Sequence, residues 1–162
     1  MATLRPGDPP AELSRRGFLR GFAATCAASV CPHALLGCGG PVAAAAARTI
    51  ALPPAVDGKI VVPVADIPEL SAVGGWVIGT STGLQEPCIV VRSEAGRIDV
   101  ASARCTHAGC NVAFNGLNYT LDCPCHGSSF ELDGQVVSGP ATLPLRAFRT
   151  EFDGATLLIA TG

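Results

Sequence analysis

The sequence has few charged and aromatic residues, and its single lysine is Lys59. Charged side chains make up 15% of the 162 residues and aromatic ones 5%, whereas soluble domains average roughly 25% charged residues. The formal net charge is −2 and no basic stripe is present, so the chain lacks the cations that neutralise nucleic-acid phosphates. We therefore expect no nucleic-acid partner, and we expect part of the chain to be something other than ordinary folded surface.

Cysteine, by contrast, is abundant. The chain has eight cysteines, and its length suits one domain with an appendage rather than two domains that each bury a separate core. Cysteine at this density indicates disulfides, a metal site or both. The question is which cysteine has which role.

Residues 1–47 are predicted to be an export signal, an apolar alanine-rich segment and a linker. Between Arg20 and Arg48 the sequence has no Asp, Glu, Lys or Arg, and alanine dominates. The preceding segment, SRRGFLR at 14–20, resembles the bacterial twin-arginine signal. That route exports proteins already folded, often with a metal cofactor inside, so we expect a periplasmic protein.

Three fates of this segment after export stay open. Leu35-Leu36-Gly37-Cys38 resembles a lipoprotein cleavage box, in which Cys38 becomes the lipidated first residue. Residues 43–47 offer small-residue cleavage sites instead. Residues 21–47 are also long enough to span a bilayer as an uncleaved anchor. Membrane attachment by a lipid or a retained signal is therefore an expectation beside simple cleavage.

The remainder, from Arg48 to Gly162, consists of short apolar or alternating runs separated by turn signals. No window longer than a short turn has a helical period, so the pattern predicts an all-β fold, an antiparallel sandwich or barrel-like domain. With few aromatic residues, its core must come from Val, Ile, Leu and Ala. The predicted strands are 49–52, 60–64, 76–79, 88–92, 98–102, 117–121, 129–132, 135–137, 145–152 and 155–160.

Several single residues and dipeptides refine this pattern. Pro63 lies within a predicted strand and indicates a sheet edge or a bulge. Cys88 lies in an apolar run and is expected to be a buried thiol. Four dipeptides are of the kind that forms two-residue hairpin loops. They are Asp57-Gly58, Asn115-Gly116, Asp133-Gly134 and Asp153-Gly154.

Two segments interrupt the strand pattern: CTHAGC, which begins at Cys105, and CPCHGSSF, which begins at Cys123. The first places His107 close to Cys105, and the second places His126 close to Cys123. No other histidine follows the alanine-rich segment. Two thiolates and two imidazoles make a four-ligand site, which is typical of zinc or of an iron-sulfur cluster with mixed ligands.

The double motif, Cys-x-His-x-x-Cys followed by Cys-x-x-His-Gly-Ser, resembles the Rieske iron-sulfur family. The likeness is to the branch found in quinol-cytochrome c oxidoreductases and related periplasmic proteins, and it covers residues 48–162. It implies a small antiparallel domain of stacked short-stranded sheets, with a cluster-binding subdomain at about 103–144. It also implies a 2Fe-2S cluster with Cys105 and Cys123 on one iron and His107 and His126 on the other.

The same branch pairs the two remaining loop cysteines, so the resemblance implies a disulfide between Cys110 and Cys125. That pairing fits the oxidising compartment implied by the export signal. The Rieske ferredoxins of aromatic-ring dioxygenases generally lack this pair.

Histidine ligation has an electrostatic consequence. Two ferric ions, two sulfides and two thiolates sum to zero charge, whereas four thiolates would give −2, so the mixed-ligand centre accepts an electron more readily. Reduction adds negative charge beside the imidazoles and favours their protonation. A structural zinc site with two Cys and two His is the remote alternative, and it would give the extra cysteine pair no role.

Residues around the site are compared with the same family. Ser128 stands where high-potential members place a hydroxyl that donates to a bridging sulfide. Phe130 replaces a tyrosine that donates to a ligand sulfur, so we expect a potential below that of quinol-oxidising members. Gly139-Pro140-Ala141 resembles the proline-bearing loop that covers the cluster. Ala108 replaces a leucine that shields the cluster in quinol-oxidising members.

The expected function is that of an exported one-electron carrier, or an electron-transfer subunit of a periplasmic or membrane oxidoreductase, rather than a stand-alone enzyme. We expect no catalytic nucleophile, and we expect His107 and His126 near the surface, where a redox partner docks. That partner would be a haem or molybdenum protein, or a cytochrome b complex. The alternatives are the Rieske subunit of a quinol-cytochrome c oxidoreductase and one like the small subunit of arsenite oxidase.

Overall fold

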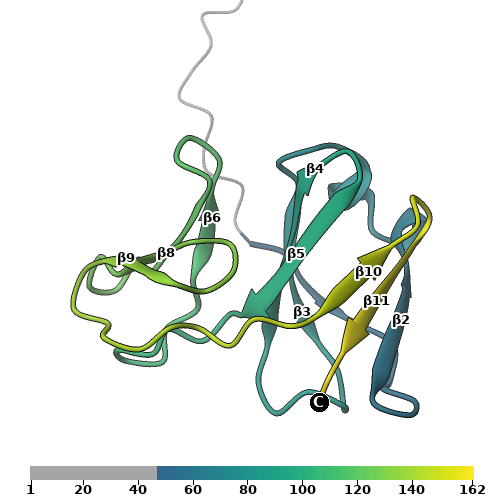
Figure 1. Ribbon diagram of the computed structural model, residues 1–162, viewed down its shortest axis with the longest axis horizontal. Coiled ribbons are helices and arrows are strands. Elements are labelled where there is room, and N and C mark those ends of the chain that lie inside the picture. Colours follow the sequence, from purple (N-terminus) through teal and green to yellow (C-terminus); the bar gives the residue numbers. More distant parts are fainter. Residues whose placement is uncertain (1–46) are drawn as a thin grey trace, which may run out of the picture. The chain divides into compact units, whose positions relative to one another are not determined.

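The computed structural model describes residues 47–162, so the predicted export segment and Cys38 lie outside the described residues. Within 47–162 the strands form three small sheets (Figure 1). The helices of this part are two short 3-10 turns, η1 (Val64–Asp66) and η2 (Pro68–Ser71). No helix among the described residues has the length and apolar character needed to cross a membrane. The all-β prediction is confirmed.

The central sheet has the strand order β1-β3-β4-β5. Its strands are β1 (Thr49–Ala51), β3 (Trp76–Thr80), β4 (Cys88–Glu94) and β5 (Arg97–Ser102). β3, β4 and β5 pair antiparallel, but β1 pairs parallel with β3, which corrects the expectation of a purely antiparallel fold. The reason is the intervening strand, which joins another sheet. The chain therefore crosses over before it returns beside β1 in the same direction.

The other two sheets are antiparallel throughout and lie at opposite ends of the view in Figure 1. One has the order β10-β11-β2, and the other runs β6-β7-β8-β9. Pro63 ends β2, an edge strand of its sheet, as the sequence predicted. The bounds are β2 (Lys59–Pro63), β10 (Thr150–Phe152), β11 (Thr156–Ala160), β6 (Ala113–Asn115), β7 (Thr120–Asp122), β8 (Ser129–Phe130) and β9 (Val136–Ser138).

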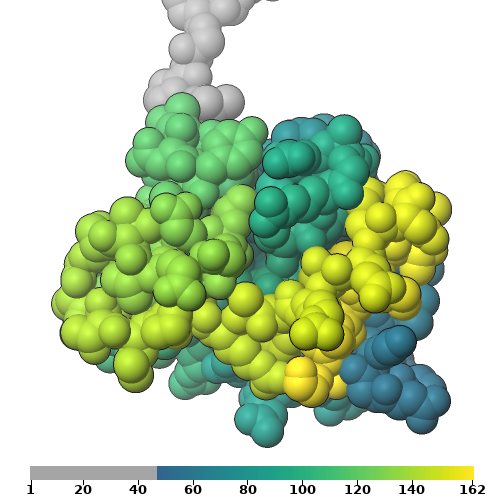
Figure 2. All heavy atoms as spheres, in the orientation of Figure 1, coloured from purple at the N-terminus to yellow at the C-terminus, as the bar shows by residue number. Residues whose placement is uncertain are grey.

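The central sheet is buried on both faces, which explains the continuous apolar run in β4. Val77 and Val90 point into a core shared with the β10-β11-β2 sheet. Ile78 and Ile89 point to the other face, into a second core shared with the β6–β9 sheet. Each fully buried side chain of this size contributes about 1.5–3 kcal/mol. The two cores join the three sheets, and the β6–β9 part forms a lobe beside the rest in the space-filling view (Figure 2).

The predicted strand at 117–121 is wrong over its first three residues, and β6 was not predicted. The side chain of Asn115 accepts hydrogen bonds from the N–H groups of Leu117 (3.0 Å) and Asn118 (3.4 Å). This local capping favours a turn over a strand. Asn115-Gly116 therefore begins a four-residue turn instead of a two-residue hairpin loop.

The predicted strand at 145–152 is also too long, because only 150–152 is regular. Its first half runs beside β5, where Ser102 and Phe148 donate backbone hydrogen bonds and Ala101 forms an isolated bridge with Ala147. Asp57-Gly58 does form a two-residue loop, with φ of +49° and +73°. Both values are those that this hairpin loop requires.

Candidate functional site

The first predicted ligand loop, residues 105–110, is closed by two backbone hydrogen bonds. The N–H of Cys105 donates to the carbonyl of Cys110 (2.9 Å), and the N–H of Gly109 donates to the carbonyl of Cys105 (2.8 Å). Gly109 has a φ of +75°, which a residue without Cβ adopts at no steric cost. The loop begins three residues after the end of β5 at Ser102, so the central sheet fixes where it begins.

The second loop, residues 123–128, repeats this geometry between β7 and β8. The N–H of Cys123 donates to the carbonyl of Ser128 (2.7 Å), and the N–H of Gly127 donates to the carbonyl of Cys123 (3.0 Å). Gly127 also has a φ of +75°. Sequence reasoning missed the repetition because the Cys–His spacing differs between the loops. The shared signal is a glycine four residues after the cysteine.

The two loops place the four predicted ligands in two pairs, one of sulfurs and one of imidazoles. Cys105 and Cys123 are each 2% exposed, and their thiols are hydrogen-bonded to one another. His107 and His126 are exposed, with ring centroids 4.8 Å apart and ring planes at 88°. The sulfurs therefore face the protein interior, and the imidazoles face the solvent.

Polar groups converge on the Cys105 sulfur. Burial raises the pKa of this thiol, but hydrogen bonds from the backbone N–H groups of His107 and Ala108, from the Cys123 thiol and from the Ser128 hydroxyl outweigh burial and lower it. Such donors stabilise a thiolate before any metal is present. The pKa of the Cys105 thiol is thus held below its usual range by these donors.

The pKa of the second thiol, that of Cys123, is shifted in the opposite direction. Burial and the neighbouring Cys105 raise the pKa of Cys123, although the N–H groups of Cys125 and His126 donate to its sulfur. Two adjacent thiolates repel each other in the absence of a cation. Iron held by both sulfurs would remove this penalty, so the paired sulfurs and the paired imidazoles fit a metal centre with mixed ligands.

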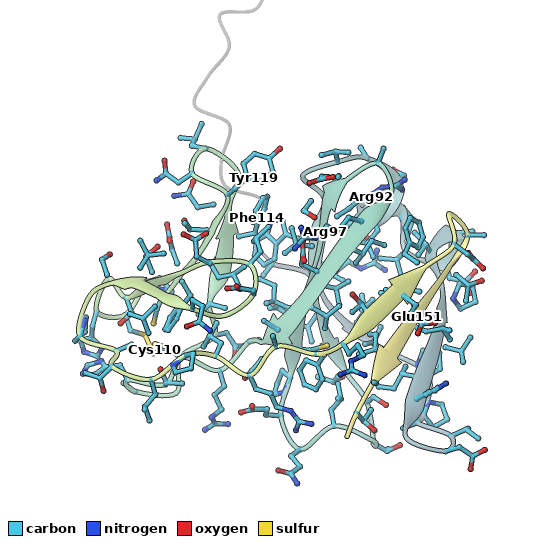
Figure 3. All side chains as sticks on the ribbon, in the orientation of Figure 1. Arg92, Arg97, Cys110, Phe114, Tyr119 and Glu151 are labelled. Carbon is cyan, nitrogen blue, oxygen red and sulfur yellow. A yellow bond between two sulfur atoms is a disulfide. The ribbon has the colours of Figure 1, made fainter. Side chains whose placement is uncertain are left out.

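A disulfide joins Cys110 to Cys125 and ties the two loops together, with a Cα–Cα distance of 6.5 Å (Figure 3). The sulfurs of this bridge and of Cys123 all lie within 4.8 Å of one another. Both bridge sulfurs are already bonded, so they offer no thiolate and do not form a separate metal site with Cys123.

The segment that follows β9 packs against both loops. The Ser128 hydroxyl is fully buried and accepts a hydrogen bond from the N–H of Ala141 (3.1 Å). Gly139 has a φ of +99°, and a Cβ at this position would lie 2.5 Å from the Cα of Ser128. The hydroxyl of Thr106 donates to the carbonyl of Leu143 (2.7 Å). Pro140, beside Gly139, is exposed.

Phe130 is fully buried in the core that also contains Cys105 and Cys123. Its ring brings apolar surface to the position where the resemblance expected a hydroxyl. Ala108, by contrast, is exposed on the first loop beside His107.

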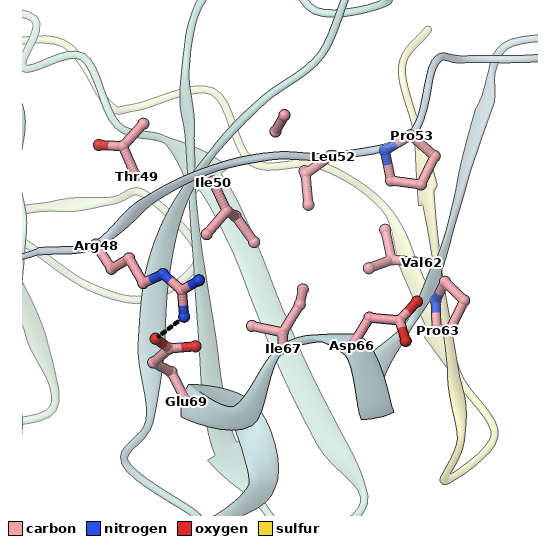
Figure 4. Close-up of a pocket in the computed structure, with 11 residues that line it drawn as sticks. Arg48, Thr49, Ile50, Leu52, Pro53, Val62, Pro63, Asp66, Ile67 and Glu69 are labelled. Carbon is pink, nitrogen blue, oxygen red and sulfur yellow. Dashed lines mark hydrogen bonds and ion pairs between the residues drawn. The ribbon is translucent and has the colours of Figure 1, made fainter.

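A hollow of about 560 Å³ lies elsewhere, between β1, β2 and the two 3-10 turns (Figure 4). Ile50, Val62 and Ile67 line it, together with Arg48 and Glu69, which form an ion pair at 2.7 Å. Hydrogen bonding to Arg48 lowers the pKa of Glu69. No residue of the two ligand loops lines this hollow, so it is separate from the candidate site.

A family model described as the Rieske 2Fe-2S domain matches residues 59–149, which include both loops. The chain belongs to the Rieske 2Fe-2S family. Membership assigns a Rieske-type 2Fe-2S cluster to the protein, and the paired sulfurs and imidazoles fit it. It also sets the zinc alternative aside, since the match extends over residues 59–149 and not only over a four-residue ligand set.

Curated relatives include iron-sulfur subunits of cytochrome b6-f complexes. The subunit of Chlorobaculum tepidum is 30% identical over 149 residues, which is 92% of this chain and 76% of the relative. That of Chlorobaculum thiosulfatiphilum is 35% identical over 75 residues, 46% of this chain and 41% of the relative. The chain thus spans less than half of the second relative.

A solved structure shows the same fold. The ferredoxin of carbazole 1,9a-dioxygenase from Nocardioides aromaticivorans has a TM-score of 0.51 at 24% identity, covering 62% of this chain and 93% of the ferredoxin. The plasma membrane Rieske protein of Synechocystis PCC 6803 is 34% identical, with a TM-score of 0.47. Its alignment covers 52% of this chain and 85% of the Synechocystis protein.

Proposed function

We propose that this Rieske protein is a one-electron carrier or electron-transfer subunit, and that four residues bind its cluster. The observation that carries the proposal is the division of the site into a buried and an exposed half. Both sulfurs are enclosed by backbone N–H groups, and both imidazoles lie side by side at the surface. The proposed ligands are Cys105, Cys123, His107 and His126.

The bound cluster supplies the one-electron couple. The chain's own residues hold it, shield one side from water and leave the other side accessible. Cys105 and Cys123 belong to an apolar core that excludes water, while His107 and His126 are exposed and offer a short path to a docked partner. The ring nitrogen that does not bind iron is in a position to take up a proton from solvent.

The partner and the compartment follow from other parts of the sequence. We infer export by the twin-arginine route from residues 14–20, with attachment through Cys38 or a retained signal as the means of membrane association. The partner is a redox protein containing haem or molybdenum, or a cytochrome b complex. The relatives named as cytochrome b6-f subunits support a subunit role as the second candidate.

Iron and sulfide analysis of the purified protein, with electron paramagnetic resonance of the reduced state, tests the cluster assignment. We expect equal amounts of iron and sulfide, two of each per chain, and a mixed-ligand signal. Bound zinc and the absence of a paramagnetic resonance signal would overturn the proposal. His126→Cys and Cys105→Ser should each lose or alter the signal. Cys88→Ser provides the matched control, because Cys88 lies in the other core.

Affinity purification of the full-length chain from detergent-solubilised membranes separates a carrier from a subunit. A stable complex that contains cytochrome b supports the subunit role. A protein released without detergent, which reduces or oxidises a haem or molybdenum protein in solution, supports the carrier.

A further inference from the structure

A carboxylate next to the second cysteine is held by three side chains that the proposed cluster ligands do not explain. Asp122 ends β7 and directly precedes Cys123. Its carboxylate accepts hydrogen bonds from Asn115 (2.7 Å), Thr120 (2.9 Å) and Ser129 (2.6 Å). These donors come from three adjacent strands, β6, β7 and β8, so the carboxylate connects the sheet that carries the second ligand loop.

All three donors are neutral. The ion pairs among residues 47–162 are Arg48–Glu69 and Arg97–Asp99, and neither includes Asp122. Carboxyl groups ionise near pH 3.9, and donors of this kind favour the ionised form. The carboxylate is therefore an anion at neutral pH that forms no ion pair within the described part of the chain.

Asp122 is half-buried among polar donors, whereas Cys123 belongs to the apolar core. Their Cα atoms are nevertheless adjacent, so roughly 10 Å at most separates the carboxylate from the Cys123 sulfur. At that distance and an effective dielectric constant near 20, a unit charge changes an equilibrium by roughly tenfold. Although the Debye length at physiological ionic strength is about 8 Å, salt screens this charge only in part, because Asp122 is half-buried and Cys123 lies in the core.

We propose that Asp122 is a fixed negative charge, held by Asn115, Thr120 and Ser129, that lowers the reduction potential of the cluster bound through Cys123. The inference rests on the proposed function. Reduction adds an electron to a centre beside this anion, and the repulsion disfavours the reduced state. Asp122 makes no bond to the cluster and acts only through its field.

A redox titration followed by electron paramagnetic resonance on the full chain tests the proposal. For Asp122→Asn we expect the ratio of reduced to oxidised protein at a fixed ambient potential to rise about tenfold, or about 59 mV for a one-electron couple. Asp153→Asn removes one carboxylate from the β10–β11 turn and should leave the midpoint unchanged. An equal shift in both variants would show only a change of net charge and would overturn the proposal.

A second pair of variants separates charge from geometry. Ser129→Ala removes one hydrogen bond but keeps the charge, so its midpoint should stay near that of the wild type. Asn115→Asp combined with Asp122→Asn reverses the direction of one hydrogen bond and moves the charge onto β6. The combination should restore stability lost in Asp122→Asn while its midpoint stays above that of the wild type. A midpoint shift in Ser129→Ala as large as in Asp122→Asn would refute the field effect.

Loss of the cluster signal has a different meaning in the variants and in the wild type. Asp122→Ser is the fallback if Asp122→Asn does not bind the cluster, and loss of the signal in both variants would make Asp122 a structural residue and overturn the proposal. A wild-type protein without a Rieske signal would refute the proposed function instead. An unchanged midpoint in variants with an intact signal would refute this inference alone.

Discussion

The rings of His107 and His126 lie with centroids 4.8 Å apart and planes nearly perpendicular, although 18 positions separate the two residues in the sequence. Each ring extends from a loop that the same pair of backbone hydrogen bonds closes. The rings therefore meet because two similar loops face each other, and the disulfide between Cys110 and Cys125 holds the loops in that arrangement.

Replacing Gly139 should loosen the segment that packs on the second loop. Gly139 and Gly154 have φ of +99° and +98°, but a Cβ would collide with Ser128 only at Gly139, since Gly154 has open space around it. Gly154→Ala should therefore cost only backbone strain, about 1 kcal/mol. Gly139→Ala should cost about 1–3 kcal/mol more, because the segment must move. Thermal unfolding and the rate of cluster loss measure both effects, and equal losses would contradict the steric argument.

Adding a hydroxyl at position 130 should raise the reduction potential. Phe130 shares a buried core with the two ligand sulfurs, and a tyrosine there could donate to one of them. One hydrogen bond of about 1–2 kcal/mol corresponds to roughly 45–90 mV for a one-electron couple. Redox titration of Phe130→Tyr checks this, with Phe114→Tyr on β6 as the control. An unchanged midpoint would refute the role given to position 130.

Breaking the disulfide should destabilise the loops more than the sheets. The bridge closes a span of 15 residues, and a loop of this length is worth about 3 kcal/mol in the chain-entropy view. We expect Cys110→Ser with Cys125→Ser to lose the visible absorption of the cluster at a lower temperature than the wild type. Far-ultraviolet circular dichroism should show the sheets unfolding later than the loss of the cluster. An unaltered bleaching temperature would argue against the loop-tying role.

Cys88 should resist thiol reagents until the domain unfolds. Its side chain is fully buried, and burial raises the pKa of its thiol to about 12. At pH 8 the thiol is therefore protonated as well as inaccessible, and the thiolate is the reactive form. Alkylation followed by peptide mapping should find this position modified only in denaturant. Modification in the native protein at pH 8 would show that the β4 core opens on its own.

The short strands and the ligand pattern could be predicted from local sequence. Alternation and turn dipeptides located β1 to β5 and β11 to within about two residues, because these segments owe their conformation to burial and local turns. One incorrect prediction lies where contacts distant in the sequence determine the conformation, and another lies where a local side-chain cap replaces a strand. Residues 145–149 have strand-like composition but run irregularly beside β5. The turn after β6 is capped by the side chain of Asn115, and composition alone does not predict the direction in which that side chain points.

By itself the sequence determined the family, the candidate ligands and the all-β class, since ligand chemistry depends on residue type and spacing. Only the tertiary structure decided that the two loops are built alike, that Gly139 has no room for a side chain and that Asp122 lies among three neutral donors. Two of these relations join separate segments, since Gly139 lies against Ser128 and the donors to Asp122 come from β6, β7 and β8. They follow from how the sheets pack, which is a property of three-dimensional contacts rather than of neighbouring residues.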